Sequence, residues 1–125
     1  MLNVENLKVQ FFHEDVKSWN TAVNQVSFKV TKGKVLGIVG ESGSGKSVTS
    51  FSIMRLYHED NANISGEITF QDINLLQLPD AEIRKYRGNK ISMIFQEPMT
   101  SLNPVFTCGY QVMEAIMLHQ QLNKE

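Results

Sequence analysis

A glycine-rich stretch in the first half of the chain carries the residues best suited to chemistry. It reads Gly40-Glu41-Ser42-Gly43-Ser44-Gly45-Lys46-Ser47 and matches the phosphate-loop pattern G-x-x-x-x-G-K-[ST] at all four fixed positions. Glycines let backbone N–H groups turn toward phosphate oxygens, and the helix that follows directs the positive end of its dipole at the same anion. Lys46 can hold the β- and γ-phosphates, Ser47 can take a place on Mg²⁺, and Val48 belongs to the same helix start. The stretch predicts a nucleoside triphosphate site.

The simpler alternative is a glycine-rich turn beside a solvated lysine. A chance match at four fixed positions is rare in a chain of this length. The loop alone does not fix the base, because GTPases, kinases and ATP-driven motors share it. A guanine site would need the sequence N-K-x-D, and the candidate Asn89-Lys90-Ile91-Ser92 lacks the aspartate. Guanine specificity is therefore disfavoured.

The elements around the loop follow the order of an α/β fold. Residues 35–39 form a continuous apolar run that predicts a parallel strand buried on both faces, and 91–95 is a second such run. Half-buried strands are predicted, from alternating apolar side chains, at 7–11, 26–30 and 64–70. Helices are expected at 47–57, 79–87 and 107–122, and a loop containing Trp19 at 13–20. The last helix carries an apolar face expected to pack in the core, formed by Val112, Met113, Ile116 and Met117.

Length, charge and cysteine content restrict the class of protein. The 125 residues make one ordinary domain, and 12 Lys and Arg against 13 Asp and Glu give a net charge of −1. No basic face stands out, so nucleic-acid binding is not expected. No apolar run approaches the ~20 residues of a membrane span, and the N-terminus lacks a signal-peptide pattern. The lone Cys108 cannot form an internal disulfide, which favours the cytoplasm, and the scattered His13, His58 and His119 indicate no structural metal site.

Two stretches carry a more specific resemblance. Residues 94–104 (Ile-Phe-Gln-Glu-Pro-Met-Thr-Ser-Leu-Asn-Pro) resemble the Q-loop region of ABC transporter ATP-binding subunits. Together with 37–47, they are similar to the oligopeptide, dipeptide and nickel importer branch of that family. The resemblance covers essentially the whole chain 1–125. It implies an α/β fold of the ABC ATPase type, a P-loop NTPase core with an N-terminal antiparallel β-subdomain, incomplete at the C-terminus.

The same resemblance implies a division of the chain and a role for particular residues. Residues 1–34 would begin the β-subdomain, 35–96 would form the P-loop core with an inserted β-strand, and 97–125 would form the Q-loop and the start of the helical subdomain. An aromatic ring on the first strand would stack on adenine. The expected ring is Phe11, with Phe12 and Trp19 as alternatives and core packing as the simpler role.

Gln96 and the residues after it are assigned by resemblance as well. The Gln96 side-chain amide is expected at the carboxyl end of a parallel strand, where it could coordinate Mg²⁺ and orient the attacking water. The exposed stretch 97–104, with two prolines, is expected to contact the cytoplasmic coupling helices of transmembrane permease subunits. An ordinary surface loop is the simpler alternative for this stretch.

The implied function is that of an ATP-binding subunit of an ABC importer, an ATPase that couples ATP binding and hydrolysis to uptake of oligopeptides or dipeptides. Such subunits work as homo- or heterodimers and are peripheral on the cytoplasmic side of the membrane. The sequence contains no Leu-Ser-Gly-Gly-Gln signature and no Walker B strand with its aspartate and glutamate. The chain is therefore expected to be the N-terminal half of such a subunit, unable to hydrolyse ATP alone and poorly soluble because of an exposed sheet edge. The alternatives are a non-catalytic ATP-binding fragment or pseudogene remnant, and a non-transport P-loop ATPase such as a small kinase or a DNA-repair ATPase.

Overall fold

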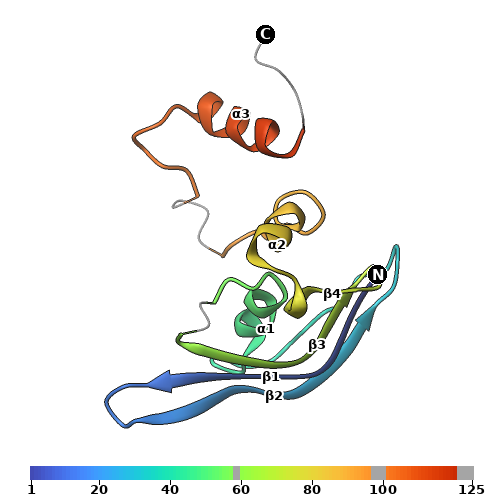
Figure 1. The fold of residues 1–125 in the computed structure, drawn as a ribbon, viewed down its shortest axis with the longest axis vertical. Helices are drawn as coiled ribbons and strands as arrows, with labels where there is room; N and C mark the ends of the chain where they lie inside the picture. Colours follow the sequence, from blue (N-terminus) through green and yellow to red (C-terminus); the bar gives the residue numbers. More distant parts are fainter. Residues whose placement is uncertain (58–59, 97–100, 121–125) are drawn as a thin grey trace. The chain divides into compact units, whose positions relative to one another are not determined.

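The computed structural model describes residues 1–57, 60–96 and 101–120. The chain divides into two compact units, Met1–Pro79 and Asp80–Glu125, of which the first holds a β-sheet and a helix and the second holds two helices (Figure 1). In chain order the elements are β1 (Leu2–His13), β2 (Ser18–Val30), α1 (Lys46–Ile53), β3 (Ala62–Phe70), β4 (Ile73–Asn74), the 3₁₀ helix η1 (Leu75–Gln77), α2 (Asp80–Tyr86) and α3 (Cys108–His119). Three predictions fall partly or wholly outside the described residues: His58, positions 97–100 of the expected partner loop, and the end of the helix expected at 107–122.

The sheet of the first unit consists of antiparallel strands in the order β2-β1-β3-β4. β1 and β2 form a long hairpin, and β3 lies along the other side of β1 (Figure 1). The predicted antiparallel β-subdomain is confirmed, and the strands predicted at 7–11, 26–30 and 64–70 are parts of longer strands. The loop expected over 13–20 is wrong in extent, because hairpin pairing continues to the pair His13 and Ser18 and includes Trp19.

One face of β1 supplies much of the core. Val4, Leu7 and Val9 are fully buried and Phe11 is half-buried, so the predicted inward face of this strand is confirmed. Val4 and Leu7 are three residues apart, and they share a face because Asn6 adopts a φ of 50° where the strand register shifts.

The alternation predicted for β2 is only partly right. Val23 is buried opposite Val9, whereas Val26 is 39% exposed. Gln25, between them, has a φ of 51° where the register shifts, so Val23 and Val26 lie on the same face, opposite the buried Val9 and Leu7. Val26 is on the core side of β2 but remains partly exposed in this edge strand of the sheet.

Helix α1 is shorter than predicted and buries different residues. It ends at Ile53 rather than at 57, because Arg55 adopts a left-handed φ of 48°. Its buried residues are Thr49 and Ser52 and not the apolar side chains of the helix. Their hydroxyls donate to the carbonyl oxygens of Gly45 (2.9 Å) and Val48 (2.8 Å), one turn back. The inward face of α1 is therefore made of small side chains whose polar atoms are satisfied within the helix.

The two apolar runs predicted as buried parallel strands are not strands in this structure. Residues 35–39 have no regular secondary structure, and Val35 and Val39 are 100% and 92% exposed. In 91–95 the sole pairing is an isolated bridge between Arg87 and Ile91, and Ile94 is 96% exposed. A buried parallel strand needs hydrogen-bonded neighbours at both edges and helices on both faces. Among the described residues no strand pairs along either run, so the predictions of buried parallel strands at 35–39 and 91–95 are wrong for this structure.

The helices of the second unit begin and end close to the predicted residues. α2 starts at Asp80, directly after Pro79, and Gly88 follows its end with a φ of 77°. α3 is capped by Thr107, whose side chain accepts a hydrogen bond from the Tyr110 N–H. The expectation that one face of α3 packs in the core is wrong, because no residue of this helix is buried. An amphipathic pattern indicates which face can be covered, not that it is covered.

Candidate functional site

The loop that precedes α1 has the backbone shape that its glycines predict. Gly43 and Gly45 have φ values of 81° and 87°, in the region that disfavours residues with a Cβ. Gly40 lies against the other end of the loop, where an added Cβ would be 2.6 Å from Ser44 Oγ. The loop 40–45 therefore turns tightly and delivers the chain into α1 at Lys46.

Gly45 also fixes the loop on the sheet. A Cβ at this position would lie 2.6 Å from the carbonyl oxygen of Ala22, in β2. Ala22 lies where the hairpin register shifts, since Val9 pairs with Val23 but Gln10 pairs with Thr21. The close approach places the start of α1 directly on this irregular part of β2.

The Lys46 side chain lies back over its own loop. Its Nζ donates hydrogen bonds to the carbonyl oxygens of Gly40 (2.8 Å) and Glu41 (2.6 Å) and to Ser44 Oγ (3.2 Å), all at the protein surface. The ammonium group is thus held beside the backbone that the phosphate-loop pattern assigns to phosphate oxygens.

The N-terminus of α1 leaves its amide groups open to an acceptor from outside the helix. The N-cap is Gly45, which supplies no side-chain cap, and the first turn has no acidic residue. The first N–H groups of a helix have no partner within it, and they carry the positive end of the dipole. Ser47 is exposed at this end, and Val48 follows it. The arrangement can accept an anion at the helix start with a lysine and a hydroxyl beside it.

The candidate adenine-stacking residues lie in two different environments. Phe11 is half-buried, on the same face of β1 as Val9, and its ring makes an edge-on contact with Tyr57 (4.9 Å between centroids, 76° between planes). Phe12 and Trp19 face each other across the hairpin (5.3 Å), and both are exposed. Neighbouring residues of a strand point to opposite faces, so Phe11 alone of the three lies on the side of β1 that carries the buried core.

Tyr57 is the last residue of the helix expected at 47–57, but in the structure it lies beyond the end of α1 and contacts two aromatic rings. These rings are Phe11 and Phe51, the latter at 5.8 Å. Burial raises the pKa of its hydroxyl, because the surrounding groups desolvate the phenolate. The sequence alone offered no signal for these contacts beyond the aromatic residue types.

Gln96 and the described part of the expected partner loop belong to the second unit. Gln96 is exposed, as are residues 101–106. Gln111 in α3 binds this loop: its Oε1 accepts from Asn103 N–H (2.8 Å), and its Nε2 donates to the carbonyl oxygens of Asn103 (3.0 Å) and Phe106 (3.1 Å). The apolar spacing that predicted the helix 107–122 gives no sign of these contacts, because they depend on the fold of the loop.

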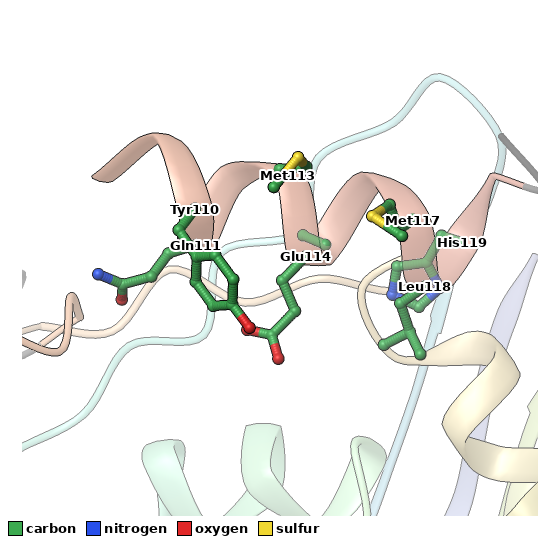
Figure 2. A pocket seen from close by; sticks show the side chains of 8 residues that line it. Tyr110, Gln111, Met113, Glu114, Met117, Leu118 and His119 are labelled. Carbon is green, nitrogen blue, oxygen red and sulfur yellow. The ribbon is translucent and has the colours of Figure 1, made fainter. Parts of the chain in front are cut away.

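A shallow hollow runs along α3, and none of the residues that line it belongs to the phosphate loop. It is lined by Tyr110, Gln111, Met113, Glu114, Ala115, Met117, Leu118 and His119. Figure 2 shows Tyr110, Glu114 and Leu118 projecting to the same side of the helix.

No helix in the described part of the chain is both long and apolar enough to cross a bilayer.

Comparison with solved structures defines the class of fold. The chain is similar to the ATP-binding cassette MJ0796 in two dimeric structures, one of them a post-hydrolysis state bound to ADP and Pi. Each match has a TM-score of 0.83 at 25% identity and covers 100% of this chain and 50% of the solved chain. The antiparallel sheet, the phosphate loop and this likeness together define the fold as that of an ATP-binding cassette.

Sequence comparison gives the family. Residues 23–124 match the ABC transporter family, and the chain belongs to it. Similar proteins include a probable peptide ABC transporter ATP-binding protein of Sinorhizobium fredii (46% identical over 99% of this chain) and the oligopeptide transport ATP-binding protein OppD of Escherichia coli (49% over 99%). The glutathione import ATP-binding protein GsiA of Salmonella typhimurium is 48% identical over 100% of this chain. The chain spans 37%, 36% and 21% of the length of these three relatives.

Proposed function

We propose that the chain binds ATP at residues 40–48 and acts within the ATP-binding subunit of an ABC importer for oligopeptides or dipeptides. The position of Lys46 carries this proposal. Its Nζ lies 2.8 Å and 2.6 Å from two backbone oxygens of the glycine loop, directly before the uncapped start of α1. A lysine charge, a helix dipole and unpaired amides at one place favour a polyphosphate over other anions.

The remaining residues of the site follow from this assignment. Ser47, exposed beside the loop, offers a hydroxyl oxygen that suits Mg²⁺, and the resemblance assigns the Gln96 amide oxygen to the same ion, which would neutralise charge on the β- and γ-phosphates. Phe11 would stack on adenine, supported by its place on the inner side of β1. Binding, charge neutralisation and orientation are the terms that phosphoryl transfer requires of the protein.

The transport role and the partners rest on the relatives. OppD and GsiA are named for oligopeptide transport and glutathione import, which favours peptides as the substrate class. We propose contact with permease subunits through 97–104, pairing with a second ATP-binding subunit, and a peripheral position on the cytoplasmic side of the membrane. The dimeric MJ0796 cassettes support the pairing. The 125-residue chain by itself is expected to bind ATP without hydrolysing it.

The test is calorimetric titration of the purified chain with Mg·ATP, beside the variants Lys46→Ala and Lys34→Ala. Lys34 is an exposed lysine outside the loop and serves as the matched control. Because a charge-assisted hydrogen bond contributes about 1.5–3 kcal/mol, Lys46→Ala should weaken binding roughly tenfold or more while Lys34→Ala leaves it unchanged. Circular dichroism must show all three proteins folded. Absence of ATP binding by the folded wild type, or equal loss in both variants, would contradict the proposal.

A further inference from the structure

We infer that Tyr57 is a positioning residue, which holds the Phe11 ring in the orientation needed to receive a nucleotide base. This inference rests on the proposed function, since it concerns the base end of the same site. Tyr57 itself is not expected to touch the phosphates. Its effect on binding would pass through Phe11.

The first support is a chain of ring contacts between the phosphate-loop helix and the first strand. Phe51 lies in α1, whose N-terminus is the phosphate loop, and its ring contacts Tyr57 at 5.8 Å and 61°. Tyr57 in turn contacts Phe11, in β1, at 4.9 Å and 76°. Such edge-on contacts are favourable arrangements for aromatic pairs. Tyr57 therefore couples the orientation of the Phe11 ring to the helix that carries the phosphate loop.

The second support is the geometry of the Phe11–Tyr57 pair. In an edge-on contact the edge of one ring meets a face of the other, so Phe11 presents either its edge or one of its faces to Tyr57. In both cases at least one face of Phe11 stays uncovered by Tyr57. The Tyr57 ring, at 76° to Phe11, thus restricts the rotation of the Phe11 ring and leaves at least one of its faces uncovered by Tyr57, and a base can stack on such a face.

The third support is the distance along β2 from Phe11 to the loop. Phe11 pairs with Asn20, and the phosphate loop rests on Ala22 through Gly45. Two residues of strand span roughly 7 Å, so ring and loop lie at neighbouring places on the same sheet. The exposed pair Phe12 and Trp19 points to the other face of the hairpin, away from the Phe11 ring and the phosphate loop.

The experiment separates the base from the phosphates by comparing ATP with inorganic tripolyphosphate, both with Mg²⁺, on the full chain. Tyr57→Leu removes the ring, Tyr57→Phe keeps it, and Phe106→Leu removes an exposed ring outside the proposed nucleotide site. We expect Tyr57→Leu to weaken ATP about 2- to 10-fold with no change for tripolyphosphate, because loss of an aromatic contact is of that size. Tyr57→Phe should restore ATP affinity, and Phe106→Leu should leave the affinity for both ligands unchanged.

The outcomes distinguish this inference from the proposed function. If the folded wild type binds neither ligand, the phosphate-loop assignment fails and the inference fails with it. If the wild type binds both but Tyr57→Leu weakens both equally, or neither, the inference alone is overturned. Failure of Tyr57→Phe to restore ATP affinity overturns it as well, since the hydroxyl rather than the ring would then matter. If circular dichroism shows that Tyr57→Leu is unfolded, Phe51→Leu takes its place, because it removes the contact between Phe51 and Tyr57. Phe51→Leu should weaken ATP binding and leave tripolyphosphate binding unchanged. A variant that weakens both ligands to the same extent, or neither, would again overturn the inference.

Discussion

The carbonyl oxygen of Ala22 lies too close to Gly45 to admit a side chain there, since a Cβ at position 45 would be only 2.6 Å from this oxygen. This relationship joins a strand residue to the last glycine before Lys46. It explains why Gly45 is buried although the rest of the loop is exposed. The phosphate loop is thus shaped by the sheet as well as by its own glycines.

Substitution of the loop glycines should separate backbone strain from this close approach. Gly43 and Gly45 both have positive φ, but a Cβ on Gly43 would meet nothing within 4 Å. Gly43→Ala should cost about 1–2 kcal/mol of unfolding free energy from strain alone. Gly45→Ala should cost roughly 1–3 kcal/mol more, because α1 must move off β2. Urea unfolding of both variants measures the difference; equal losses would show that the contact with Ala22 has no energetic weight.

Arg55 should contribute to stability through the segment after η1. Its Nη1 donates to the carbonyl oxygens of Leu75 (3.4 Å) and Leu78, which ties the end of α1 to residues 75–78. Arg55→Ala should lower the unfolding free energy by about 1–2 kcal/mol, since charge-assisted bonds to partly buried carbonyls are lost. Arg84→Ala, at an exposed position in α2, is the control and should stay within about 0.5 kcal/mol of wild type. A similar change in both variants would contradict the assignment.

Hydrogen exchange should distinguish the two kinds of apolar segment in the first unit. Amides of β1 are paired on both sides with β2 and β3, whereas residues 35–39 lie outside any strand. We expect slow exchange in β1 and exchange at nearly the rate of an unfolded peptide in 35–39. Mass spectrometry on peptic fragments reads both segments in one experiment. Protection of 35–39 would show that this run does form a strand in solution.

Gln111→Glu should loosen the loop 103–106 without unfolding α3. The substitution keeps an oxygen for the Asn103 N–H but replaces the Nε2 donor, so a carboxylate would face two carbonyl oxygens. Limited proteolysis should then cut within 103–106 at least several-fold faster. Glu114→Gln, an exposed position of the same helix, changes charge by a similar amount and should leave the cleavage rate unchanged. Unaltered cleavage of Gln111→Glu would mean that other contacts hold the loop.

Tyr57 should make the stability of the chain depend on alkaline pH. Because desolvation raises its pKa in the folded state above the ordinary value near 10, the folded protein favours the protonated phenol. Its contribution is intact below that ordinary value and is lost as pH rises through the raised pKa. Tyr57→Phe should therefore lose less stability than wild type between pH 9 and about 11, measured by thermal unfolding. Parallel pH profiles for the two proteins would contradict this expectation.

Local patterns predicted much of this structure because the relevant forces are local. The phosphate loop follows from its glycines, α2 from Pro79 and Gly88, and the inward face of β1 from the spacing of Leu7 and Val9. The same reasoning placed residues 40–48 at one site, since they are contiguous in the chain. The division of the chain at 34 and 96 and the roles of Gln96 and Phe11 stay predictions.

Features that depend on distant segments could not be read in the same way. Hydrophobicity marked 35–39 as able to form a buried strand, but a strand also needs neighbours that pair with it. The left-handed conformations of Asn6 and Gln25 shift the hairpin register, and the sequence has no glycine at these positions that would have predicted them. The contacts of Ala22 with the loop and of Tyr57 with Phe11 arise only once the sheet and α1 have packed together.

Two of the three oxygens that hold the Lys46 ammonium are main-chain carbonyls, those of Gly40 and Glu41. Every amino acid provides such a carbonyl, so the side chain at position 41 can be exchanged while this anchor is kept. Glu41 is exposed, and Cys108 is the single cysteine of the chain. A Cys108→Ser background with Glu41→Cys would therefore accept an environment-sensitive fluorophore beside the lysine, and its emission would report ligand arrival in real time.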